Sequence, residues 1–126
     1  ASMPALLKAQ EVQKRAARVG FDWPDISGPR TKLDEEIAEL DEAIALGDQA
    51  AIHEEMGDVI FSAVNLCRHT KVQGEQALQD TLSKFKRRFS RVEELAKEQQ
   101  VSLASAGIDE LDRLWDKVKL EEKENA

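Results

Sequence analysis

Four acidic residues occur at matched spacings in two neighbouring parts of this sequence. Glu36 and Glu39 belong to the segment EEIAE, and Glu55 and Asp58 belong to the segment EEMGD. Residues three apart share one face of a helix, so each segment would present a pair of carboxylates. Converging carboxylates repel one another, and hard divalent cations such as Mg²⁺ or Mn²⁺ relieve that repulsion. The spacing therefore favours a carboxylate metal site over its alternative, two solvated acidic faces.

The apolar residues around the acids recur with a helical period. The first stripe is Leu33, Ile37, Leu40 and Ile44, and the second is Ile52, Met56, Val59, Ala63 and Leu66. On a wheel of 100° per residue, the acids of the two segments lie at the same angles from their own stripes. We therefore expect an antiparallel helical hairpin in which the two carboxylate pairs converge beside the seam.

The whole chain shows helical periodicity. It predicts helices at about 4–19, 29–46, 49–69, 75–99 and 109–121, and no segment alternates as a strand would. Short links imply antiparallel neighbours, so the predicted fold is an all-α bundle of four main helices plus a short C-terminal helix. We expect a single domain over residues 1–126, with 1–3 a cloning remnant and 122–126 a frayed tail.

Composition narrows the classes of partner. The 126 residues are 41% hydrophobic and 34% charged, with a formal net charge of −7, which argues against binding a nucleic-acid polymer. No apolar run approaches a membrane span, and no signal peptide is visible. The single cysteine is typical of a protein of the reducing cytoplasm.

Basic residues gather on one flank of the predicted fourth helix. Lys84, Arg88 and Arg91 lie beside its apolar stripe, and Lys119 follows Trp115 by one turn in the last helix. Such a flank is either solvated or, beside a metal cluster, placed to neutralise phosphate oxygens that the metal leaves free. Trp115 itself is interpreted as a core residue on this pattern.

The sequence resembles the MazG nucleoside triphosphate pyrophosphohydrolases, within the all-α NTP pyrophosphatase group that includes dimeric dUTPases. The family signature, EExxE followed by ExxD, appears here as Glu35 to Glu39 and Glu55 to Asp58. The segments RAARVGFDWPD, EEMGDVIFSAVNLCRH, KFKRRF and LWDKVK extend the resemblance over about residues 6–120. Together these segments look like the catalytic C-terminal domain of tandem-domain bacterial members.

This resemblance implies an activity, a metal and an assembly. It implies hydrolysis of an NTP or dNTP to the monophosphate and pyrophosphate, with Mg²⁺, or Mn²⁺ in its place, as cofactor. The implied metal ligands are Glu36, Glu39, Glu55 and Asp58, and the implied nucleotide contacts are Lys84, Arg88, Trp115 and Lys119. It also implies a homodimer or a dimer of dimers. The helix at 49–69 has a second apolar face, with Ile60, Phe61 and Val64, which such an assembly would cover.

Several roles and functions stay open at this level. Glu35 or Glu54 would orient or deprotonate the attacking water. Asn65 lies on the same face of its helix as Glu55 and Asp58 and would contact a sugar or base. Trp23 either stacks on a base or anchors its loop. A di-iron bundle would need Glu-x-x-His, which neither acidic pair provides. The remaining alternative is a non-catalytic bundle whose acidic face docks a basic partner or which binds nucleotides without cleaving them.

Overall fold

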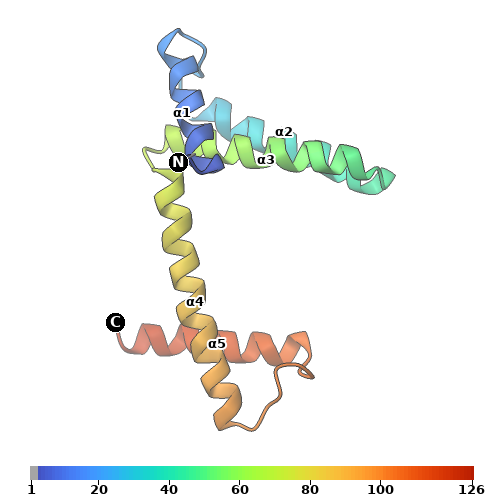
Figure 1. The fold of residues 1–126 in the computed structure, drawn as a ribbon, viewed down its shortest axis with the longest axis vertical. Helices are drawn as coiled ribbons and strands as arrows, with labels where there is room; N and C mark the ends of the chain where they lie inside the picture. The colour runs from blue at the N-terminus through green and yellow to red at the C-terminus, as the bar shows by residue number, and fades with distance from the viewer. Residues whose placement is uncertain (1–2) are drawn as a thin grey trace. The chain divides into compact units, whose positions relative to one another are not determined.

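The computed structural model describes residues 3–126 as five α-helices joined by loops (Figure 1). The helices are α1 (Ala5–Arg18), α2 (Ser27–Leu46), α3 (Gln49–His69), α4 (Gly74–Glu98) and α5 (Ile108–Glu124). No strand occurs among these residues, which confirms the all-α class. Nor does any helix of this range have the length and apolar character needed to cross a bilayer. Residues 1 and 2 of the expected cloning remnant lie outside the described part.

The helix ends follow local chemistry. The Asp48 carboxylate accepts a hydrogen bond from the Ala51 amide at 3.2 Å and caps α3, which has the predicted bounds. Gly47 ends α2 with a left-handed φ of 68°. α2 begins at Ser27, earlier than predicted, and this places Pro29 in the first turn, where no amide hydrogen is needed.

The C-terminal helix is longer than expected. α5 continues to Glu124, so residues 122–124 of the expected frayed tail are helical. Arg88 of α4 donates to the Glu122 carboxylate at 2.8 Å, and this ion pair holds the last turns of α5 against α4. Sequence periodicity gave no sign of helix over residues 122–124, because it does not reveal a partner on another helix.

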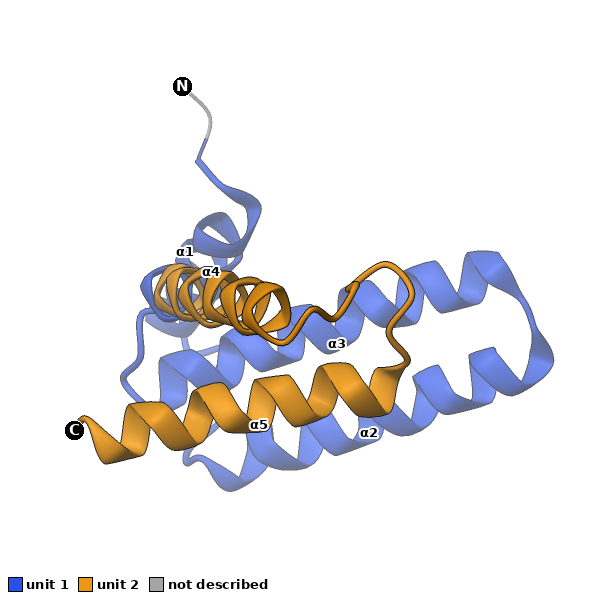
Figure 2. Cartoon of the chain, turned by 90° about the horizontal axis from the view of Figure 1, so that it is seen from below, with its two compact units in different colours: residues 1–77 blue, residues 78–126 orange. Residues whose placement is uncertain are grey.

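The chain forms two compact units, one ending at residue 77 and the other covering residues 78–126 (Figure 2). In the first unit α2 and α3 lie side by side as an antiparallel hairpin, and α1 packs against α3. In the second unit α5 crosses the C-terminal half of α4 (Figure 1). The buried side chains at this crossing are Val92, Leu95, Ala96, Leu114 and Val118.

Two buried glutamines attach α1 to its neighbours. The Gln10 side chain donates to the Val72 carbonyl at 3.2 Å and accepts from the Gly74 amide at 2.9 Å. Gln13 donates to the Phe61 carbonyl of α3 at 2.9 Å. Both glutamines are more than nine-tenths buried. Buried polar groups need such partners, so α1 is docked by specific hydrogen bonds as well as by apolar contact.

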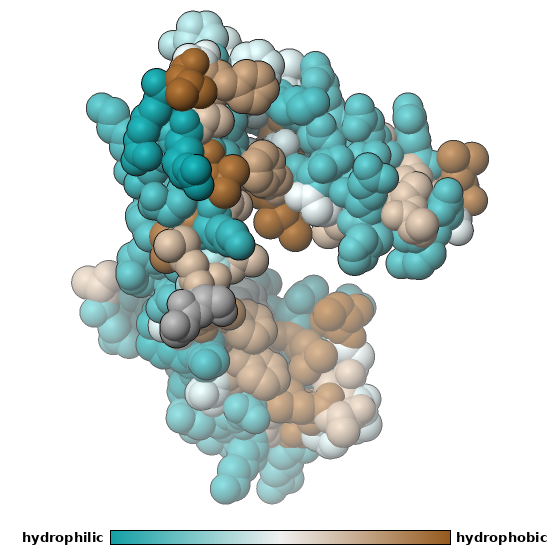
Figure 3. Space-filling view, turned by 45° about the horizontal axis from the view of Figure 1, so that its top comes forward, coloured by the Kyte–Doolittle hydropathy of each residue, from teal (hydrophilic) through white to brown (hydrophobic). Residues whose placement is uncertain are grey.

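Several apolar stripes remain partly open to solvent. Figure 3 shows hydrophobic side chains at the surface, and on α4 the first four members of the predicted stripe are 40 to 53% exposed. These are Leu78, Leu82, Phe85 and Phe89. On the hairpin, Ile37, Ile44 and Met56 are similarly exposed. The predicted α4 core is thus buried only at Val92 and Ala96, because α5 covers only the C-terminal part of α4 within this unit.

The loop between α1 and α2 is held to the end of α3 by one carboxylate. Arg68 donates to Asp22 at 3.0 Å, and the His69 ring nitrogen Nε2 lies 2.9 Å from the same carboxylate. Hydrogen bonds from Arg68 hold the pKa of Asp22 well below its usual range. This contact fixes the loop residues that follow, including Trp23.

We predict that Asp22→Asn lowers stability at neutral pH by about 1 kcal/mol. The Asp22 pKa is depressed in the folded state, so its contribution is present above the unfolded pKa of about 3.9 and is lost as pH falls below that value. Thermal melts between neutral and acidic pH measure this, and the variant should show a shallower acid-induced drop than the wild type.

Asp34→Asn is the matched control, because Asp34 pairs with Arg30 only on the exposed face of α2. It should change the melting temperature less. Identical pH profiles for the wild type and Asp22→Asn would show that this contact does not hold the loop.

Candidate functional site

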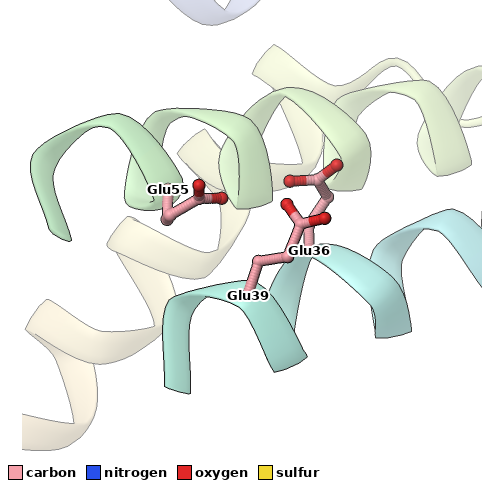
Figure 4. Close-up of side chains that lie close together, drawn as sticks. All are labelled: Glu36, Glu39 and Glu55. Atoms are coloured by element: carbon pink, nitrogen blue, oxygen red, sulfur yellow. The ribbon is translucent and has the colours of Figure 1, made fainter. Parts of the chain in front are cut away.

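The α2–α3 hairpin brings three carboxylates together. Glu36 and Glu39 extend from α2 and Glu55 extends from α3 into the space between the two helices (Figure 4). One oxygen from each carboxylate lies within 4.8 Å of the other two. We call these three residues the acidic cluster. Their meeting follows from the matched spacings, since each acid lies beside the apolar stripe of its own helix and the two stripes face each other.

The acidic cluster contains buried oxygens without a hydrogen-bond partner. Glu36 is only 5% exposed, and its Oε1 accepts a hydrogen bond from Lys32 at 2.9 Å. The Oε2 atoms of Glu36 and Glu55 are buried and have no partner among the described residues. Burial of a carboxylate oxygen without a partner is costly, so this arrangement calls for a donor or a cation that the chain itself does not supply.

The charges around the acidic cluster also favour a bound cation. Partial burial, together with the charges of Glu39, Asp58 and Glu36, raises the pKa of the Glu55 carboxyl. The hydrogen bond and charge of Glu36 raise the pKa of Lys32, which stays an ammonium. One ammonium group cannot neutralise three carboxylates, so the cluster retains an excess of negative charge.

The donor set fits a hard divalent cation. All the ligand atoms are carboxylate oxygens, with no thiolate or imidazole among them, and this composition suits Mg²⁺ or Mn²⁺. Oxygens bound to one such ion at about 2.1 Å lie roughly 3–4 Å apart. The 4.8 Å spread of the cluster is close to that, so small side-chain rotations would bring the oxygens onto one ion.

The other predicted acids lie outside the cluster. Asp58 is exposed on α3, one turn after Glu55, and its charge acts on the Glu55 carboxyl although it does not join the three. Glu35 and Glu54 are exposed, and Glu35 lies 4.0 Å from the Lys32 ammonium. Of the six predicted acids, Glu36, Glu39 and Glu55 are thus gathered, Glu39 at an exposed position, and Asp58, Glu35 and Glu54 do not join them.

The predicted basic and aromatic residues of the second unit are partly engaged. Arg88 lies 5.9 Å from the centroid of the Trp115 ring and pairs with Glu122. Arg91 binds Glu121 at 3.0 Å and also reaches Glu94 and Glu98. Trp115 is half-buried against Phe85, with the ring centroids 5.4 Å apart. Lys84 and Lys119 are exposed. Arg88 and Trp115 therefore meet, while Arg91 is taken up by glutamates.

Trp23 and Asn65 both line a cavity of about 550 Å³ in the first unit. Its walls come from α1, the loop at 19–26, the start of α2 and α3. The Trp23 ring rests on Gly28, where an added Cβ would come within 2.5 Å of the ring. Trp23 is therefore anchored by its loop and also exposed to the cavity, so the two alternatives considered for it are compatible.

Two residues of this region escaped the sequence-based prediction. Lys32 pairs with Glu36 across one turn of α2, and the i,i+4 spacing of opposite charges was a readable signal for it. Gln13 lines the cavity from α1. Its signal was weaker: Gln10 and Gln13 fall three apart on the face of α1 that turned out to be buried.

Fold and site together define an all-helical protein with an acidic centre suited to a divalent cation. Residues 29–93 match the family model of the MazG nucleotide pyrophosphohydrolase domain. That range holds all of α3, most of α2 and α4, and all four predicted metal ligands. The chain belongs to the MazG nucleotide pyrophosphohydrolase domain family.

Individual relatives extend the match to almost the whole chain. It is 41% identical to a nucleoside triphosphate pyrophosphohydrolase of Escherichia coli K12 over 96% of its length. It is 42% identical over 93% of its length to the nucleoside triphosphate pyrophosphohydrolase/pyrophosphatase MazG of Thermotoga maritima. The chain covers 47% and 45% of these two relatives, respectively. It is also 45% identical over 69 residues to YabN of Bacillus subtilis, 14% of whose length it covers.

We predict that Glu55→Gln raises the melting temperature of the metal-free protein. The substitution removes one of three neighbouring negative charges and so lowers their mutual repulsion. Melts in the presence of a chelator at neutral pH should show a higher melting temperature for the variant than for the wild type. Glu54→Gln, at the exposed neighbouring position, is the control and should change little. A Glu55→Gln protein that melts at or below the wild-type temperature would contradict the repulsive character of the cluster.

Proposed function

We propose that this chain hydrolyses nucleoside triphosphates, ribose or deoxyribose, to the monophosphate and pyrophosphate, with Mg²⁺ as the metal and Mn²⁺ as a substitute. One observation carries the proposal: the acidic cluster holds two buried, unpartnered carboxylate oxygens at signature positions of a MazG domain. Support comes from the Escherichia coli and Thermotoga maritima relatives, which are named for this activity. The chain spans a little under half of the length of each relative.

The metal ligands we assign are Glu36, Glu39, Glu55 and Asp58. The first three already lie together, and Asp58, one turn beyond Glu55, would complete the set by a side-chain rotation. When bound, Mg²⁺ supplies positive charge against the triphosphate and acidifies a water molecule. Lys32 binds Oε1 of Glu36, so Oε2 of Glu36 is the oxygen that would bind the ion.

The remaining steps fall to residues outside the cluster. Glu35 or Glu54, exposed and next to the ligands in sequence, accepts a proton from the attacking water. Lys84, Arg88 and Lys119 neutralise phosphate oxygens, with Arg91 as a further candidate. The Arg88 guanidinium lies over the Trp115 ring, 5.9 Å from its centroid. In this proposal the Trp115 ring contacts the nucleotide.

We also propose that the chain acts as one MazG-type domain and assembles as a homodimer or a dimer of dimers. The support is the partly exposed apolar stripe along α4 and the exposed Ile37, Ile44 and Met56 of the hairpin. Exposed apolar stripes of this kind are typical of interfaces, and a second copy would complete the helical bundle by covering them.

A second candidate is a module that binds nucleotides, or a basic partner, without catalysis. One observation favours it: Arg88 and Arg91 are both paired with α5 glutamates, so neither guanidinium is free for phosphate without rearrangement. The two candidates differ in whether a product is released, and a direct assay separates them.

We predict that the purified chain with Mg²⁺ releases pyrophosphate, not orthophosphate, from a panel of NTPs and dNTPs. Glu39→Ala and Asp58→Ala should each lower the rate by at least about 100-fold, because each removes a proposed ligand and even outer-shell partners of a metal contribute 10–100-fold. Glu42→Ala, on α2 outside the signature, is the control and should retain the wild-type rate.

Circular dichroism checks that each variant keeps its helical content. Orthophosphate as the first product, or undiminished turnover in both ligand variants, would rule out the proposed reaction. Absence of turnover in the wild type, combined with nucleotide binding, would favour the second candidate.

A further inference from the structure

The C-terminal turns of α5 carry carboxylates that engage the basic flank of α4. Arg88 donates from Nε to both oxygens of Glu122, at 2.8 and 3.0 Å. Arg91 donates from Nε and Nη2 to the two oxygens of Glu121, at 3.1 and 3.0 Å. A carboxylate presents two oxygens to a guanidinium much as a phosphate does. The two glutamates therefore lie where phosphate oxygens would bind if these arginines contact a nucleotide.

The two arginines differ in how completely they are held. Arg91 also donates from Nη1 to Glu94 at 3.0 Å and to Glu98 at 3.5 Å, so three carboxylates surround it. Within the described part of the chain Arg88 has one carboxylate partner, Glu122, which binds only Nε. The Nη1 and Nη2 atoms of Arg88 have no hydrogen-bond partner among these residues. Arg88 is therefore the arginine whose partner can be exchanged.

The end of α5 depends on these ion pairs for its position. Val118 is the last buried side chain of the helix, and Leu120 is 56% exposed. In Figure 1 the C-terminal end of α5 extends past its crossing with α4. Three of the last four helical residues are glutamates, and the helix dipole disfavours carboxylates at a C-terminus. Loss of the arginine pairs would therefore leave the last turns of α5 without a restraint.

The pair between Arg88 and Glu122 is open to displacement by another anion. Their side chains are 22% and 34% exposed, and ion pairs that water reaches contribute little to stability. The hydrogen bond from Arg88 lowers the pKa of Glu122, which is therefore ionised at neutral pH. A phosphate that bound Nη1 or Nη2 would place its charge beside this carboxylate, and like-charge repulsion would favour the departure of Glu122.

We propose that Glu122 is an intramolecular competitor of the substrate phosphates, which holds Arg88 until a nucleoside triphosphate displaces it and releases the end of α5. The choice of a nucleotide as the competing ligand, and of Arg88 as its contact, rests on the proposed function. The pairing of Arg88 then acts as an autoinhibitory contact, which raises the concentration of nucleotide needed to fill the site.

The first test compares nucleotide binding to Glu122→Gln and to the wild type by titration calorimetry with Mg²⁺. The ligands are the α,β-methylene analogues of ATP, GTP, CTP and UTP, in which carbon replaces the bridging oxygen and pyrophosphate cannot leave. Glu122→Gln should bind its tightest analogue about threefold to tenfold more tightly than the wild type, because Arg88 no longer has an ionised partner. Equal or weaker binding, or no binding to either protein, overturns the proposal.

Glu124→Gln is the matched control. It removes the same charge from the same end of α5, at an exposed position, and should bind as the wild type does. In an Arg88→Ala background, Glu122→Gln should bring no further gain, because the guanidinium for which it competes is absent. An equal gain in Glu124→Gln, or the same gain without Arg88, would show a general effect of charge and overturns the proposal.

Hydrogen exchange of the unaltered chain tests the release of α5 without relying on the folding of any variant. Saturation with the tightest analogue should speed amide exchange over residues 121–125, because these turns lose their ion pairs. Amides at the crossing of α4 and α5, near Leu95 and Leu114, should keep their protection. Exchange over residues 121–125 that is unchanged or slower overturns the proposed release.

These outcomes are separable from those of the proposed hydrolysis, because the analogues cannot be cleaved. Tighter binding by Glu122→Gln, without pyrophosphate release from any natural triphosphate, would remove the hydrolysis and leave the competition in place. Pyrophosphate release with analogue binding that is indifferent to Glu122→Gln would leave the hydrolysis and remove the competition.

Discussion

The repulsion among three carboxylates held together by the α2–α3 hairpin is the constraint on which the rest of this structure depends. Helix packing forces Glu36, Glu39 and Glu55 within 4.8 Å of one another, and one ammonium, from Lys32, offsets only part of their charge. A hairpin selected for stability alone would place apolar or paired side chains there. The arrangement is understandable if an oxygen-seeking cation, absent from the chain itself, completes it.

The surrounding structure extends this centre into a binding region. Lys32 touches both the acidic cluster and the neighbouring cavity, so charge at one bears on ligand contacts at the other. The cavity owes its shape to polar contacts: Gln13 ties α1 to Phe61, and Asp22 ties the loop to Arg68. Each of these contacts also orients a group at the cavity wall. The same hydrogen bonds therefore maintain the fold and prepare the site.

Much of the fold was predictable because helical periodicity and caps are local properties. The bounds of α3, its Asp48 cap and the Gly47 stop were readable from neighbouring residues, and so was the approach of Glu36, Glu39 and Glu55 to one another. Side-chain positions that depend on another element were not. Asp58 lies outside the cluster, and a helical wheel could not predict this because it gives the angle of a residue but not its rotamer. Glu122 pairs with Arg88, 34 residues away in the sequence, and this pair holds the end of α5. Gln13 could not be chosen because only the packing of α1 on α3 leaves its oxygen unpartnered.

The central claim is that the acidic cluster exists to hold a divalent cation. Anomalous diffraction from crystals grown with Mn²⁺ tests it most directly. We predict an anomalous peak between α2 and α3, at about 2.0–2.6 Å from oxygens of Glu36, Glu39 and Glu55. The account would be contradicted by Mn²⁺ bound elsewhere on the chain with no peak among these carboxylates, or by a lysine or arginine side chain in the space between them.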